Sequence, residues 1–202
     1  MIKDLDETLR TLLLRDLHTV LDRGSVPEIS FETPDDQFPP QSVHLPAIDL
    51  FLYDVRENQE LRSNEVYVQR GSDGTAIKTR APTRIDFSYL ITAWPKPGVP
   101  DPAEVEHNLL GVVMQVLLTY PTIPENVLQG DLRTQEPALP VSALQAGRLQ
   151  SLGEFWQALG GKPKAALNYQ ITLSIAAFQQ EQVPLVSDKT IKLRMQNRGT
   201  IS

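Results

Sequence analysis

The chain has 202 residues, of which 41% are hydrophobic and 22% charged, and its formal net charge is −6. This composition predicts a soluble protein with a sizeable core, built as one domain or as one domain with a tail. The acidic balance argues against nucleic acid as a partner, because neutralising phosphates requires clustered lysine and arginine. The absence of cysteine excludes disulfides and thiolate metal sites. No apolar stretch approaches the about 20 residues of a membrane span, so no direct membrane insertion is expected.

The first half of the chain predicts a helix and then a long strand. Residues 2–23 place leucines at helical spacing and stop before Gly24. A short strand is predicted within 26–32, and the proline-rich segment 33–46 predicts an extended loop. Residues 48–56 predict a strand that is apolar on both alternating faces, as in a strand covered on two sides.

Three further strands are predicted in the middle of the chain. A Gly-Ser-Asp-Gly run at 71–74 predicts a hairpin between strands at 66–68 and 76–78. Residues 83–94 alternate well between apolar and polar side chains and predict a long strand with one buried face. The Pro-Lys-Pro-Gly run after Trp94 ends this strand.

The second half predicts helices at 101–120 and 153–159. Asp101 and Pro102 are typical of the first positions of a helix, and the many apolar residues after them predict a central place in the core. Ser151 and Glu154 form a capping-box pattern that opens the second helix. The segment 121–150 between them predicts mostly loop, with a short turn near 125–128.

The last predicted core strand is 167–177, where apolar and polar residues alternate most clearly. These elements predict an α+β fold in which a mixed, mainly antiparallel sheet packs against helices. Domain boundaries are expected at 1–178 for the folded domain and 179–202 for a C-terminal tail.

No catalytic motif is present, and no cofactor is expected. The three histidines are isolated in sequence, so no metal site is predicted. Asp49 and Asp54 are expected on opposite faces of one strand, which rules out an acid–base pair there. Arg84 and Asp86 share a strand face and predict an ordinary surface ion pair. The chain is therefore not expected to be an enzyme.

A dense set of charges and amides follows the strand that ends near Arg56. Mixed charges and amides this close together can pair across a repeated subunit contact, where they fix geometry more than they add affinity. An exposed loop is the alternative interpretation. The residues predicted for a protein interface here are Arg56, Glu57, Asn58, Arg62, Asn64 and Glu65.

Four segments of the chain resemble a known family. They are IDLFLYDVRENQELRSNE at 48–65, FSYLITAW at 87–94, YPTIPENVLQGDL at 120–132 and EFWQALGGKPKAALNYQITLSI at 154–175. In order and spacing they are similar to the cap, or tail-terminator, proteins of phage-tail-like contractile injection systems, over residues 1–178.

The resemblance implies a phage tail-terminator-like fold and a structural role without catalysis. It implies a homohexamer, a six-fold ring that caps the inner tube and sheath, with the sheath and inner-tube subunits as partners. Assembly is expected in the cytoplasm, as part of a particle that is later released or docks on a membrane. A soluble monomeric adaptor or chaperone that binds a single protein partner is the alternative, and an enzyme comes third.

The tail carries one more predicted strand, within 188–197. Apolar residues alternate with polar ones there, and the four basic residues of 188–198 contrast with the acidic chain. An isolated strand must pair with a sheet edge, either in its own domain or in a neighbouring subunit. The residues expected to set its register are Ile191, Leu193 and Met195.

Overall fold

The computed structural model describes residues 1–21, 26–71, 75–135, 138–144 and 151–184. The chain divides into two compact units. The larger unit contains Met1–Arg62 and Thr83–Ile175, and the smaller unit contains Ser63–Pro82 and Ala176–Ser202. Both helices and mixed sheets are present, so the predicted α+β class is confirmed.

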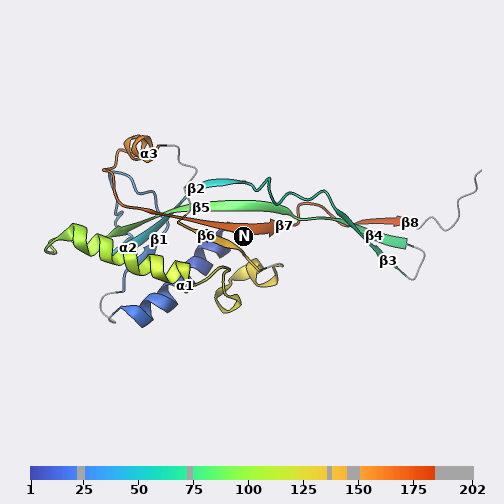
Figure 1. Ribbon diagram of the computed structural model, residues 1–202, viewed down its shortest axis with the longest axis horizontal. Helices are drawn as coiled ribbons and strands as arrows, with labels where there is room; N and C mark the ends of the chain where they lie inside the picture. Colours follow the sequence, from blue (N-terminus) through green and yellow to red (C-terminus); the bar gives the residue numbers. More distant parts are fainter. Residues whose placement is uncertain (22–25, 72–74, 136–137, 145–150, 185–202) are drawn as a thin grey trace, which may run out of the picture. The chain divides into compact units, whose positions relative to one another are not determined.

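The larger unit is built on a five-stranded sheet (Figure 1). Its strand β1 pairs with β2 in parallel, and every other pair is antiparallel. This is the mixed, mainly antiparallel arrangement that the sequence predicts. In spatial order the strands are β1 (Glu28–Ser30), β2 (Ala47–Glu57), β5 (Thr83–Trp94), β7 (Leu167–Ile175) and β6 (Val141–Ala143).

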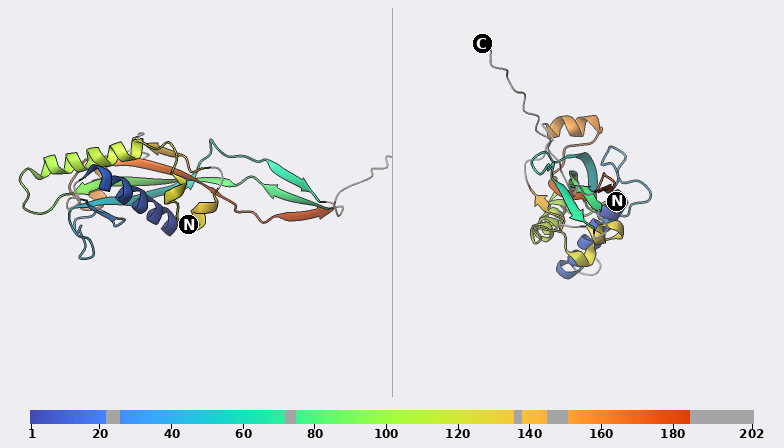
Figure 2. Two further views of the ribbon diagram at one scale, coloured as in Figure 1. Left: turned by 90° about the horizontal axis from the view of Figure 1, so that it is seen from below. Right: turned by 90° about the vertical axis from the view of Figure 1, so that its right-hand side faces the viewer.

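Two helices, α1 (Ile2–Val20) and α2 (Pro102–Leu118), lie on the same side of this sheet (Figure 2). The amphipathic spacing of α1 turns a leucine face entirely out of water. From β5 the sheet contributes Phe87, Tyr89 and Ile91, all at most 1% exposed. This layer is the core of the unit. The leucines of α1 that are fully buried are Leu5, Leu9, Leu12, Leu13 and Leu17.

Helix α2 covers the sheet with one face only. Leu110, Val113, Val116 and Leu117 are buried, whereas Leu118 is 55% exposed. These four residues belong to the core, as expected, but the helix is buried on one face only, because most of its other apolar residues are half-buried. Asp101 does occupy the N-cap position, but its φ is 50° and its side chain makes no capping bond.

The short helix α3 (Leu152–Ala158) lies on the opposite face of the sheet (Figure 1). Ser151 Oγ accepts a hydrogen bond from the Glu154 amide at 3.2 Å, which confirms the predicted N-cap. The ring of Phe155 lies 6.1 Å from that of Phe51 on β2. Trp156, next to it, is 1% exposed and so anchors the short helix by burial.

The segment predicted as loop, 121–150, contains more structure than expected. It forms two 3₁₀ turns, η1 (Glu125–Val127) and η2 (Gly130–Thr134), and the edge strand β6. Beyond β6, the Gln135 side chain continues the pairing along β7. Its Nε2 donates to the Ser174 carbonyl at 2.8 Å, and its Oε1 accepts from the Ser174 amide at 3.2 Å. A single side-chain amide thus satisfies both backbone groups at this edge.

The smaller unit is a three-stranded antiparallel sheet. The predicted hairpin is confirmed as β3 (Val66–Arg70) and β4 (Thr75–Arg80), and β8 (Glu181–Pro184) pairs with the other side of β4. The first part of the predicted tail thus pairs within its own chain. Of the described residues in this unit, only Ala76 and Ala81 are buried.

Candidate protein interface

The end of β2 is shaped by a bulge. The register against β5 shifts between Leu52 and Asp54, so Asp49 lies opposite Thr92 while Asp54 lies opposite Ser88. Because Thr92 and Ser88 are four residues apart, both aspartates lie on one face of the sheet. The prediction of opposite faces is therefore wrong, since it assumed an unbroken alternation.

Two ion pairs order the charged residues beyond the bulge. Arg56 Nε lies 2.5 Å from Asp54 Oδ2 on the same face. Arg62 binds Glu57 with two parallel hydrogen bonds of 2.8 and 2.9 Å, a geometry that fixes both side chains. Both arginines stay at the surface, with 44% and 58% of the side chain exposed. The two pairs present fixed charges of both signs to the solvent.

Asn58 is joined to the sheet through a buried carboxylate. Its Nδ2 donates to both oxygens of Asp86 at 3.1 Å, and Thr172 Oγ1 donates to Asp86 Oδ1 at 2.7 Å. Asp86 is 1% exposed, so the expected surface ion pair with Arg84 is wrong. Arg84 instead donates from Nη1 to Ser174 Oγ. The Asn58 amide anchors the turn at 58–61, where its Oδ1 accepts from the Leu61 amide at 3.0 Å.

The sheet therefore brings together four of the predicted interface residues in the larger unit: Arg56, Glu57, Asn58 and Arg62. Together with Gln59 and Glu60, the first three line a hollow of about 370 Å³. All four make polar contacts within their own chain. Charges of both signs that are held in place around a hollow suit recognition of a partner with a complementary charge pattern.

Asn64 and Glu65 belong to the smaller unit. They line a separate hollow of about 310 Å³ with Lys78, Arg80 and Phe178 among its other walls. Glu65 Oε2 accepts a hydrogen bond from Tyr67 Oη at 3.0 Å, which raises the pKa of Tyr67. The remaining predicted interface residues, Ile191, Leu193 and Met195, lie outside the described residues.

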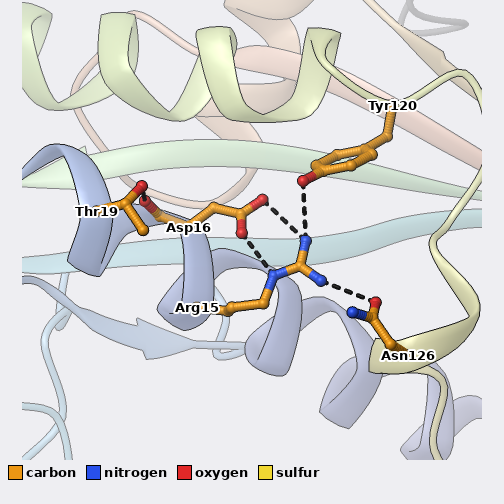
Figure 3. A network of polar contacts seen from close by, with 5 residues as sticks. All are labelled: Arg15, Asp16, Thr19, Tyr120 and Asn126. Atoms are coloured by element: carbon orange, nitrogen blue, oxygen red, sulfur yellow. Dashed lines mark hydrogen bonds and ion pairs between the residues drawn. The ribbon is translucent and has the colours of Figure 1, made fainter.

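A polar network that sequence reasoning missed joins α1 to the segment after α2 (Figure 3). Arg15 forms a two-point pair with Asp16, at 2.6 and 3.1 Å. The same guanidinium donates to Tyr120 Oη and to Asn126 Oδ1, both at 2.9 Å. This pairing lowers the pKa of Asp16. The sequence carries no signal for the role of Arg15, although its partners Tyr120 and Asn126 lie in the segment 120–132 that resembles the family.

Asp49 is the clearest perturbed carboxyl in the larger unit. It is fully buried in β2, and its Oδ1 accepts a hydrogen bond from the Glu32 amide at 3.0 Å. Burial raises its pKa to about 7. Within the described residues, no three histidine or acidic side chains gather as metal ligands. None of the helices that the structure describes is long and apolar enough to cross a membrane.

The comparisons with known proteins agree with one another. The Pvc16 N-terminal domain family matches residues 4–188. None of the curated proteins compared with the chain matches it. Of the solved structures, the "PVC sheath/tube terminator in extended state" of an extracellular contractile injection system has a TM-score of 0.64 and 20% identity over 100% of this chain. The "AFP tube terminating cap" of the anti-feeding prophage has a TM-score of 0.60 and 21% identity over 96%.

This chain spans 65% and 62% of the lengths of those two proteins. At these identities the likeness shows the fold, and that fold is shared with terminators of contractile injection systems. The resemblance seen in the sequence is confirmed at this level.

Proposed function

This chain belongs to the Pvc16 N-terminal domain family, and we propose that it is a structural cap of a contractile injection system. In this role it closes the distal end of the inner tube and sheath as a homohexameric, six-fold ring. The observation that carries the proposal is the fold, which matches a solved sheath/tube terminator over 100% of the chain and a solved tube terminating cap over 96%.

The surface of the larger unit supports a binding role. A ring needs contacts that are heterologous, so two different surfaces of each copy must meet. The fixed ion pairs of Arg56 with Asp54 and Arg62 with Glu57 provide one such patterned surface. We assign these residues, with Asn58, to a contact with a neighbouring cap subunit or with the sheath.

Deletion of the gene tests the cap role. Cells without the protein should yield sheath–tube particles of irregular length, or no stable particles, because nothing closes the growing end. Electron microscopy measures the length distribution, and the intact gene returned in trans is the control. Particles of normal and uniform length in the deletion strain would overturn the proposal.

Mass measurement separates the cap from a monomeric adaptor or chaperone. A cap forms a closed ring, alone or on a tube end, and light scattering on the purified chain and on chain mixed with tubes detects it. A protein that stays monomeric in both samples would be an adaptor or chaperone instead.

We also propose that the particle assembles in the cytoplasm. Fractionation of cells collected before the culture lyses would show whether the protein is in the cytoplasmic fraction.

The segment beyond β8 is proposed to add a strand to a neighbouring cap or sheath subunit. Two truncations test this. Ending the chain after Pro184 keeps β8, whereas ending it after Gln180 removes the strand that pairs with β4. If the first variant folds but no longer joins the sheath, strand donation stands. If it unfolds or aggregates while the full chain does not, the segment stabilises its own domain.

A further inference from the structure

The smaller unit has almost no interior of its own. All five residues of β3 are exposed, with Tyr67 at 56% and Val68 at 57%. Because side chains alternate along a strand, Val66 and Val68 lie on one face and Tyr67 on the other. A three-stranded sheet of this size needs an apolar face packed against something to be stable in water. The missing contact must come from outside the unit.

The hollow in this unit is bounded by two basic side chains that form no ion pair among the described residues. Lys78 and Arg80 lie two residues apart on one face of β4, and both line the 310 Å³ hollow. In the part of the chain that the structure describes, neither forms an ion pair, although Glu181 lies opposite Lys78 on β8. Glu65 is the one acidic residue in the lining, and its carboxylate accepts a hydrogen bond from Tyr67.

An aromatic ring holds one of these cations in place. The Arg80 guanidinium carbon lies 5.0 Å from the centre of the Phe178 ring, and Phe178 also lines the hollow. A guanidinium stacked on a ring keeps its N–H groups free at the edge, where they suit two-point binding of a carboxylate. Asn64, at the same hollow, adds an amide donor.

The charge of the chain is divided unequally between its two units. The larger unit holds 12 Lys and Arg against 21 Asp and Glu, a net charge of −9. The smaller unit holds seven against four, a net charge of +3. The larger unit of a second copy therefore offers carboxylates in excess over cations to the basic hollow. Two unlike surfaces meeting between copies form a heterologous contact, which can close into a ring.

We infer that the hollow formed by Asn64, Lys78, Arg80 and Phe178 receives a carboxylate side chain from the larger unit of a second copy. The exposed apolar residues of β3 pack beside this contact and so gain the cover that their own unit lacks. The inference rests on the proposed ring and names the surfaces that would join its subunits. Lys78 and Arg80 act there as binding residues.

Charge reversal in the full-length protein tests the contact. The double variant Lys78→Glu/Arg80→Glu should raise the dissociation constant of self-association at least about tenfold, because like charges now meet. The matched control, Lys3→Glu/Lys96→Glu, makes the same charge change at two exposed residues of the larger unit and should leave self-association unchanged. Sedimentation at about 50 mM and about 500 mM NaCl measures the self-association of both variants and of the wild type. High salt should weaken the self-association of the wild type, because it screens the charges in contact. Circular dichroism checks the fold of each variant.

Zero-length cross-linking identifies the partner surface. A carbodiimide joins a lysine amine directly to a carboxylate in contact, and an equal mixture of ¹⁴N and ¹⁵N protein distinguishes links between copies. We expect Lys78 linked to a carboxylate of the larger unit in a mixed-isotope pair. Links only within one copy, or a reversed-charge variant that associates like the wild type, would overturn the inference and leave the ring standing. A wild type that stays monomeric, both alone and on tubes, would overturn the ring and this contact together.

Discussion

The two units of this chain are stabilised in different ways. In the larger unit, a leucine face of α1 and the apolar face of β5 exclude water from a continuous core. In the smaller unit, three strands are joined by backbone hydrogen bonds, and their side chains mostly face solvent. The comparison teaches that one chain can combine a part with a water-excluding core and a part whose apolar residues remain exposed. Four sets of variants can break or sharpen this contrast.

The largest difference is expected from core truncation. Leu12→Ala, in the larger unit, should lower the free energy of unfolding by about 2–5 kcal/mol, because it leaves a cavity in a fully buried layer. Val68→Ala, in the smaller unit, should change it by no more than about 0.5 kcal/mol. Urea denaturation of both variants measures the contrast. Equal losses would show that the smaller unit has a core of its own.

A smaller effect should depend on pH through Asp49. Its raised pKa of about 7 means that the folded state binds more protons than the unfolded state above the ordinary value of 3.8. Stability should therefore fall as pH rises from about 4 to about 7, by up to about 4 kcal/mol, and then level off. Asp49→Asn should remove this fall and be more stable than wild type at pH 8.

The control for Asp49→Asn is Glu104→Gln, which makes the same charge change on an exposed residue of α2. Thermal unfolding of all three proteins between pH 4 and 8 gives the comparison. If Asp49→Asn keeps the pH slope of the wild type, then another group is responsible for the slope.

Asn58 should stabilise the end of the larger sheet. Asn58→Ala removes two hydrogen bonds to the buried Asp86 carboxylate and one from the Leu61 amide. The expected cost is about 1–3 kcal/mol, because the buried carboxyl group keeps only the hydrogen bond from Thr172. Asn64→Ala, an exposed change in the smaller unit, should cost no more than about 0.5 kcal/mol. Identical denaturation midpoints would show that Asn58 has no structural role.

A substitution at Arg62 is expected to change stability least of the four and to change assembly most. Arg62→Glu should abolish ring formation with a change in stability within about 0.5 kcal/mol. The swap Glu57→Arg/Arg62→Glu rebuilds the ion pair within the chain but reverses both charges toward a neighbour. Assembly by the single variant would remove Arg62 from the interface. If the swap alone restored assembly, the pair would act only within its own subunit.

Most of the fold could be predicted because its signals are local. The leucine spacing of α1, the alternation along β5 and the Ser151 cap each act within a few residues. The three-residue strand β6 was missed because it is stable only through its partner β7, which lies far along the chain. The bulge at Tyr53 was missed because nothing in a run of apolar residues marks one extra residue.

The candidate interface was only partly predictable for the same reason. Sequence marked the dense charges of 56–65, yet it could not show that Asp86 is buried and bonded to Asn58. Nor could it place Lys78, Arg80 and Phe178 around one hollow, since Phe178 comes close to Arg80 only because the chain returns to pair β8 with β4. Such contacts follow from the path of the chain in space, which a pattern of residues along one strand does not contain.

The Gln135 amide that pairs with Ser174 has a consequence for storage and crowding. Proteins often guard a free sheet edge with lysine, whose repulsion between copies weakens in concentrated salt. Glutamine carries no charge, so its two hydrogen bonds persist across the physiological range of acidity and ionic strength. The pairing at this part of the sheet edge should therefore hold in concentrated salt and in crowded solution, conditions that would weaken an electrostatic guard.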